Sequence, residues 1–110
     1  MVKSKTNLFD KETANQAVLF KALSHPARLA ILKYLAETKS CITGDISDQI
    51  PLGRTTVNQH LKELKEVGLV IGETSGVKTN YCLNSKTINK VSKLLIQFFD
   101  SLEAYTCACD

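Results

Sequence analysis

The sequence predicts a mainly α-helical domain with one small β-hairpin. Most of the chain repeats apolar residues at spacings of three and four, which is the period of an amphipathic helix. After Gly68 the pattern changes to two short β-favouring runs, Leu69–Ile71 and Tyr81–Leu83, around a polar segment punctuated by glycine. The 110 residues suffice for one hydrophobic core and are too few for two.

The first two helices are expected to be separated by a short break at Ser24. Asp10 is a suitable N-cap for a helix that runs to about Leu23. Ser24 is then expected to cap the second helix, because Pro26 is well tolerated in a first turn. The residues expected to face inward from this second helix are Leu29, Leu32 and Leu35, with Ile31 and Ala36 beside them.

A strand of one or two residues is expected within 41–43, and a short helix from about Thr43 to Ile50. A further helix begins near Arg54. Its narrow apolar stripe consists of Val57, Leu61 and Leu64. Gly68 is expected to end this helix, because glycine takes a left-handed C-terminal position at the least cost.

The last predicted helix has an apolar face wider than a small core needs. Ser85 is its expected N-cap. The apolar residues of this helix are Ile88, Val91, Leu94, Leu95, Phe98, Phe99 and Leu102. Such a face near a terminus favours packing against a partner helix, so a homodimer is predicted. The alternative is that the face only closes the core of one chain.

Composition and charge set broad limits on partners and location. Hydrophobic residues make up 44% and charged residues 23%, and the net charge of +3 permits a nucleic-acid partner. The chain start lacks the apolar centre of a signal peptide, and no apolar run could span a bilayer. A cytoplasmic location with reduced thiols is therefore expected. We expect a flexible arm at 1–9, a folded domain at 10–104 and a cysteine-containing tail at 105–110.

The outward face of the helix that begins near Arg54 is rich in side chains of the kind that bind DNA. Hydroxyl, amide and imidazole groups can reach base edges, whereas cationic groups suit phosphates. The candidate DNA-binding residues, with one lysine from the hairpin, are Arg54, Thr55, Thr56, Asn58, Gln59, His60, Lys62 and Lys78. Most amphipathic helices present such a face to water alone, so this segment by itself leaves both interpretations open.

The order of elements is that of a winged helix-turn-helix, and three segments resemble one family in particular. KALSHPARLAILKYLAE (Lys21–Glu37), CITGDISDQIPLGRTTVNQHLKELKEVGLV (Cys41–Val70) and YCL (Tyr81–Leu83) resemble the ArsR/SmtB family of metal- and thiol-sensing repressors. The resemblance covers about residues 12–100. Asn58 stands where the family commonly has Ser, so the preferred base step can differ.

The resemblance implies a homodimer paired through its first and last helices. Each subunit would place its recognition helix in the major groove of an inverted repeat in double-stranded operator DNA, with the hairpin against the flanking backbone or minor groove. No membrane partner is implied. A regulator is predicted rather than an enzyme, because the chain has no Gly-rich phosphate loop, no His-Glu-x-x-His helix and no recognisable Ser–His–acid set.

The four cysteines are the candidate sensors. The resemblance implies that arsenic-type members use a Cys-x-Cys pair, whose positions fall on Ile42 and Gly44 here. Strand alternation instead puts Cys41 and Cys82 on one face of neighbouring strands. The candidate metal ligands, of which a subset is expected to bind, are Cys41, Cys82, Cys107 and Cys109. Three thiolates would suit trivalent arsenic, antimony, cadmium or lead.

The predicted inducer is therefore arsenite or another thiophilic ion, which folding does not require. Two alternatives stay open. The same cysteines could sense oxidants or reactive sulfur by forming a disulfide or polysulfide link. The chain could also be a metal-blind DNA-binding regulator, in which the cysteines are small buried hydrophobes or tail residues.

Overall fold

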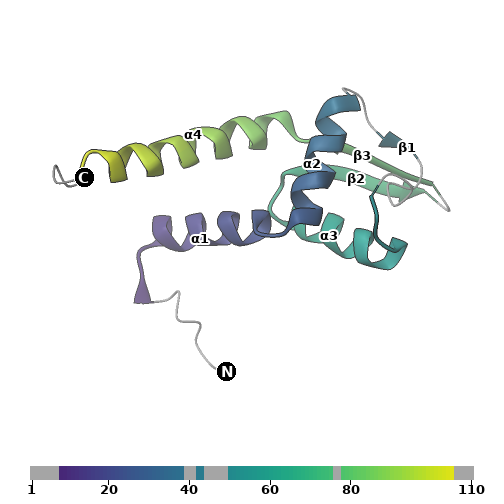
Figure 1. Ribbon diagram of the computed structural model, residues 1–110, viewed down its shortest axis with the longest axis horizontal. Coiled ribbons are helices and arrows are strands. Elements are labelled where there is room, and N and C mark those ends of the chain that lie inside the picture. The colour runs from purple at the N-terminus through teal and green to yellow at the C-terminus, as the bar shows by residue number, and fades with distance from the viewer. Residues whose placement is uncertain (1–7, 39–41, 44–49, 76–77, 106–110) are drawn as a thin grey trace.

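A computed structural model describes residues 8–38, 42–43, 50–75 and 78–105 of the chain. Four helices and a small sheet follow in the predicted order (Figure 1). The elements are α1 (Lys11–Leu23), α2 (Pro26–Thr38), β1 (Ile42–Thr43), α3 (Arg54–Glu66), β2 (Val70–Ser75), β3 (Lys78–Leu83) and α4 (Ser85–Glu103). The mainly α-helical fold with a β-hairpin is confirmed. The short helix expected up to Ile50 lies outside the described residues.

The molecule has two parts that differ in shape. The helices α2 and α3 and the sheet form a packed unit, from which α1 and α4 extend together to one side (Figure 1). The overall dimensions are 54 × 39 × 25 Å. No helix in the described part of the chain is both long and apolar enough to cross a membrane.

The hydrophobic core joins the helices to the start of the hairpin. The predicted stripe of α3 is confirmed, since Val57, Leu61 and Leu64 are each at most 1% exposed. The remaining buried members of this core are Ile31, Leu35, Ile50, Leu69, Val70 and Val91. Because α3 is anchored by one narrow stripe, its other faces remain available at the surface.

The sheet has the strand order β1-β3-β2, and both pairs are antiparallel. In the hairpin, Val70 pairs with Leu83 and Ser75 pairs with Lys78. The strand β1 adds two residues to the other edge of β3, where Ile42 pairs with Tyr81. The hairpin is confirmed and is longer than the sequence runs indicate, because polar residues continue the ladder toward the tip.

A glycine ends α3 and starts the hairpin. Gly68 has a φ of +83°, as predicted for a helix C-terminus. The backbone N–H of Gly68 donates to the carbonyl of Lys65 at 3.0 Å, and that of Leu69 donates to Leu64 at 3.1 Å. These two bonds form a Schellman motif, in which the buried Leu64 and Leu69 supply the accompanying apolar contact.

The caps agree with the sequence at one helix and differ at two. Asp10 caps α1 as predicted, and hydrogen bonds from Thr13 lower the pKa of its carboxyl. Ser24 does not cap α2 as predicted. Instead, the ring Nδ1 of His25 accepts the backbone N–H of Ala27, and the His25 carbonyl accepts the N–H groups of Arg28 and Leu29. The cap of α4 is Asn84 rather than Ser85.

The inward face predicted for α2 is wrong by part of a turn. Ile31 is fully buried and Leu35 is 3% exposed, but Leu29 is 43% exposed. Ala27 is buried in its place, whereas Ala36 is exposed. The helix therefore buries the face defined by residues at spacings of four, because α3 packs against it there.

Candidate nucleic-acid interface

The exposed face of α3 carries most of the candidate DNA-binding residues. The N-cap of α3 is Gly53, whose backbone is extended and which makes no side-chain hydrogen bond. The candidates whose side chains are exposed along α3 are Arg54, Thr55, Thr56, Asn58, Gln59 and Lys62. Seven of the eight candidates thus lie on α3, and six of them are exposed to solvent.

Charge is distributed unevenly along α3. The first half carries Arg54 and neutral hydrogen-bonding side chains, whereas the second half carries Glu63 and Glu66 beside Lys62 and Lys65. Carboxylates repel phosphates, so the N-terminal half is the part suited to approach a nucleic acid. The positive end of the helix dipole also lies there.

His60 is placed differently from the other candidates on α3. It is partly buried, and its Nδ1 accepts a hydrogen bond from Nε of Arg28 at 3.1 Å. Its ring lies against His25, with a centroid separation of 4.2 Å. Partial burial lowers the pKa of His60, the charges of His25 and Arg28 lower it further, and Glu63 raises it.

Arg28 is a functional candidate that the sequence did not reveal. It is 32 positions from His60 in the chain, so no periodicity or short motif relates the two residues. Arg28 also donates to the carbonyl oxygens of Lys21 and Ala22 in the last turn of α1. One side chain therefore connects three helices.

The hairpin candidate Lys78 begins β3, where its backbone pairs with Ser75 next to the tip. Residues 76–77 and the side chain of Lys78 lie outside what the structure describes. The hairpin extends from α2 and α3 on the side opposite to the free ends of α1 and α4 (Figure 1).

Of the four cysteines, only Cys82 lies among the described residues. It sits on β3 opposite Ile71, is partly buried, and is bonded in a disulfide. Cys41, Cys107 and Cys109 lie outside the described residues, and so does most of the predicted tail at 105–110. Within the described ranges, no group of three or more His, Cys, Asp or Glu side chains could hold a metal ion.

Apolar side chains are exposed along α1 and α4. An aromatic cluster links the two helices, because Phe20 lies edge-on to Phe98 with a centroid distance of 5.4 Å and to Phe99 at 6.4 Å. The large apolar residues that are more than half exposed on these helices are Val18, Ile96, Phe99 and Leu102. Leu8 and Phe9, just before α1, are also exposed.

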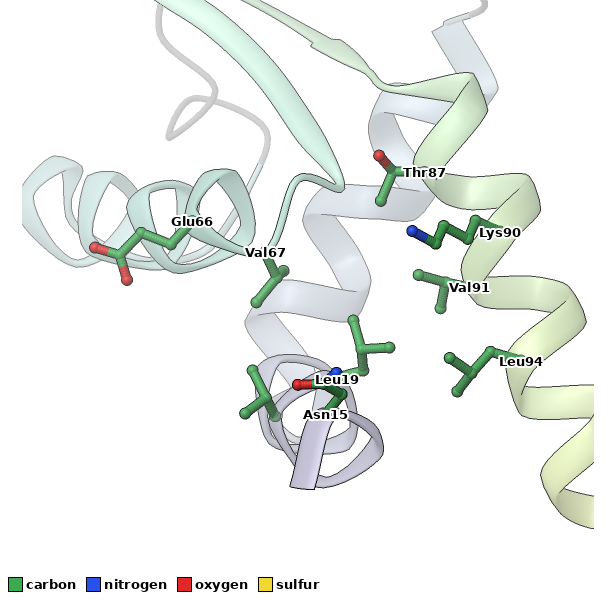
Figure 2. Close-up of a pocket in the computed structure, with 9 residues that line it drawn as sticks. Asn15, Leu19, Glu66, Val67, Thr87, Lys90, Val91 and Leu94 are labelled. Carbon is green, nitrogen blue, oxygen red and sulfur yellow. The ribbon is translucent and has the colours of Figure 1, made fainter. Parts of the chain in front are cut away.

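A cleft of about 390 Å³ separates α1 and α4 next to the end of α3. Leu19 and Asn15 line it from α1, and Val67 lines it from the turn after α3 (Figure 2). From α4, Lys90 and Leu94 point toward the opposite wall (Figure 2). The cleft shows that α4 is not packed tightly against α1 along this stretch.

Comparison with known proteins agrees with the fold. Residues 23–73 match a family model described as a helix-turn-helix domain. An uncharacterised HTH-type transcriptional regulator of Methanocaldococcus jannaschii is 34% identical over 79 residues, which cover 72% of this chain and 89% of that protein. The HTH-type transcriptional repressor SmtB of Mycobacterium tuberculosis is 40% identical over 65 residues, which cover 59% of this chain and 47% of the repressor.

Solved structures share the architecture. An ArsR-like transcriptional regulator from Rhodococcus superposes with a TM-score of 0.65 at 24% identity, covering 84% of this chain and 86% of the other. The fold, with its polar-faced helix before the hairpin, is that of a winged helix-turn-helix protein. The chain belongs to the HTH-type transcriptional regulators, a class of proteins that bind DNA.

Proposed function

We propose that this protein is a transcriptional repressor that binds an inverted-repeat operator as a homodimer and releases it when its cysteine thiols react. The observation that carries the DNA-binding part is the exposed N-terminal half of α3, held rigidly by the buried stripe of Val57, Leu61 and Leu64. Helix-turn-helix proteins contact bases with this part of the recognition helix.

The exposed residues of α3 divide by chemistry into two roles. Thr55, Asn58 and Gln59 are neutral donors and acceptors suited to base edges, and Gln59 can form a bidentate pair with adenine. Arg54 and Lys62 are suited to phosphates, which contribute affinity and little sequence information. Lys78 is proposed for the flanking backbone.

The test begins with a duplex that the protein itself selects from a randomised pool. Gln59→Ala should weaken binding to this duplex by about 1–3 kcal/mol in an anisotropy titration, the usual worth of a bidentate base contact. Gln97→Ala is the matched control, because Gln97 is an exposed glutamine on α4. Equal affinity of the two variants would show that α3 is not the reading helix.

A second copy of the chain is the proposed partner for α1 and α4. These helices extend from the packed unit and expose Val18, Ile96, Phe99 and Leu102 on the same arm. Several large apolar side chains exposed on one arm favour an association site there. Two copies joined symmetrically by these helices would have α3 helices related by a two-fold axis, as an inverted repeat requires.

The proposed signal acts on thiols. Arsenite would form three As–S bonds with three thiols, whose protons leave with the arsenite hydroxyl groups as water, whereas another thiophilic ion would bind the thiolates and release their protons to solvent. The disulfide at Cys82 favours the redox alternative, because a disulfide sulfur is no longer a thiolate ligand. Cys41 is the proposed bonding partner, because strand alternation in the sequence puts Cys41 and Cys82 on one face of neighbouring strands.

In the redox step, two thiols lose two protons and two electrons to an oxidant such as a peroxide, and one S–S bond forms. Mass spectrometry distinguishes the signals. Peroxide should remove two hydrogens and release the duplex, whereas an arsenite adduct would add mass. Cys41→Ser and Cys82→Ser should both abolish peroxide release, and the Cys107→Ser/Cys109→Ser double variant should retain it. Release that survives in Cys82→Ser would contradict a thiol switch at this site.

A further inference from the structure

Arg28 ties the end of α1 to α3 through a single guanidinium. Its Nε–H donates to Nδ1 of His60 at 3.1 Å. Its Nη1 donates to the carbonyl oxygens of Lys21 at 3.1 Å and Ala22 at 3.2 Å. These carbonyls lie at the negative end of the α1 dipole, which favours a positive group. Because the guanidinium is a rigid fork, its two sets of bonds fix α1 and α3 with respect to each other.

The bond from Arg28 determines where the hydrogen sits on His60. A guanidinium has donors only, so Nδ1 of His60 must be the acceptor. A neutral imidazole with an accepting Nδ1 carries its hydrogen on Nε2. The tautomer of His60 is therefore set by a residue of another helix.

His25 restricts His60 from a second direction. The two rings are 4.2 Å apart between centroids and are tilted by 43°. The ring of His25 is itself held in place, because its Nδ1 accepts the backbone N–H of Ala27 at 3.0 Å. With Nδ1 engaged and a neighbouring ring against it, His60 has Nε2–H as its remaining polar edge.

His60 belongs to the same part of the surface as two candidate DNA contacts. A hollow of about 250 Å³ is lined by Arg28, Gln59, His60, Lys62, Glu63 and Glu66. The charged or titratable groups around His60 are thus Arg28 on α2, His25 before α2, and Lys62, Glu63 and Glu66 on α3. From α1 there are the two carbonyl oxygens that hold Arg28.

We propose that Arg28 and His25 are positioning residues that keep His60 neutral, so that α3 presents Nε2–H as a fixed donor to an acceptor atom on DNA. The inference rests on the proposed function, in which α3 reads the operator. Suitable acceptors are N7 of guanine and adenine, O6 of guanine, O4 of thymine and the phosphate oxygens. The exocyclic amino groups of adenine and cytosine are unsuitable because they donate.

Protonation of His60 would undo this arrangement. A protonated ring carries N–H at Nδ1, which cannot accept from Arg28 and places two positive groups together. Specific binding should therefore weaken on acidification, because α3 loses its link to α1. Non-specific binding should strengthen, because an added positive charge favours phosphates. Because the two affinities change in opposite directions, the ratio of specific to non-specific affinity is a sensitive measure of the protonation of His60.

The experiment compares the selected duplex with a scrambled duplex of the same length and composition. Between about pH 7.5 and pH 5.5, the ratio of specific to non-specific affinity should fall about 3- to 10-fold, the worth of one hydrogen bond. Circular dichroism at each pH confirms that the protein stays folded. A ratio that does not change with pH in the wild type overturns the inference.

Three variants separate the roles. His60→Asn keeps an acceptor near the position of Nδ1 and does not titrate, so its ratio should be independent of pH. Arg28→Lys keeps the positive charge but lacks the planar guanidinium. Its ratio of specific to non-specific affinity at pH 7.5 should therefore equal that of the wild type at pH 5.5. Lys33→Arg is the matched control on α2, because Lys33 is exposed, and it should behave as wild type.

Two further measurements identify the acceptor and test the tautomer. The acceptor atoms are altered one at a time with 7-deaza purines, 6-thioguanine, 4-thiothymine and methylphosphonates. At one position the change should weaken binding of the wild type and not of His60→Asn; insensitivity to all of these series overturns the inference. In the free protein, nitrogen NMR should find the hydrogen of His60 on Nε2, and a hydrogen on Nδ1 overturns it. Failure of the proposed function is recognised separately, because Gln59→Ala would then bind the selected duplex normally.

Discussion

The backbone N–H of Leu69 donates to the carbonyl of Leu64 at 3.1 Å, which closes the end of α3 around Gly68 and directs the chain into β2. This bond requires the left-handed φ of +83° at Gly68. The same turn places the carbonyl of Leu69 within 2.9 Å of the Asn84 N–H, so the end of α3 and the start of α4 are joined.

Gly68→Ala should destabilise the protein by about 1–2 kcal/mol, the cost of a left-handed conformation for an L-residue. The added methyl group would also lie 3.4 Å from Oγ1 of Thr87. Urea denaturation measures the free energy of unfolding. Gly53→Ser is the control, because Gly53 has ordinary backbone angles and open space around it. Equal stability of the two variants would show that the turn is not strained.

Asn84→Ala should destabilise the protein by about 1 kcal/mol, because the Asn84 side chain accepts the Thr87 N–H at the start of α4. Ser85→Ala should change the free energy of unfolding by less than about 0.5 kcal/mol, because Ser85 is an exposed first-turn residue. The two variants are compared by urea denaturation. A larger destabilisation in Ser85→Ala than in Asn84→Ala would show that Ser85, the N-cap predicted from the sequence, caps α4.

Lys62→Gln should reduce the salt dependence of operator binding. Each phosphate contact contributes about 0.9 to the slope of log K against log salt concentration, so the slope should become shallower by about that amount. Anisotropy titrations over a series of salt concentrations measure it. Lys33→Gln, an exposed lysine on α2, should leave the slope unchanged. Identical slopes for all three proteins would remove Lys62 from the interface.

The free energy of unfolding should fall as the pH drops below 6.5, the ordinary pKa of a histidine, because the pKa of His60 is lowered in the folded state. Below that pH the unfolded chain binds a proton at His60 more readily than the folded chain does, so acidification favours unfolding. Above that pH both states are neutral at His60 and the full free energy of unfolding is retained. The urea midpoint of the wild type should fall more between about pH 7.5 and pH 5.5 than that of His60→Asn. Parallel decreases would contradict the assignment to His60.

Phe99→Glu should convert the proposed dimer to a monomer at micromolar concentration, because a carboxylate would replace a side chain that is 53% exposed on the apolar arm. Sedimentation measures the mass. Lys93→Glu is the control, because Lys93 lies about 200° around α4 from the buried Val91. A wild-type chain that sediments as a monomer would remove the dimer altogether.

The sequence by itself determined the elements whose signals are local. The stripe of Val57, Leu61 and Leu64, the stop at Gly68 and the cap at Asp10 are each set by residues within one or two helical turns. The polar face of α3 could be found in the same way, because a helix with one buried stripe must expose its other sides.

Only the tertiary structure decided which face α2 buries, which residues cap α2 and α4, and what His60 contacts. The α2 sequence is apolar on several sides, so the position of α3 selects Ile31 for the core and leaves Leu29 exposed. His60 appears in the sequence as one more polar residue of α3. Its bond to Arg28 spans 32 positions, and such a contact exists only once the helices have packed.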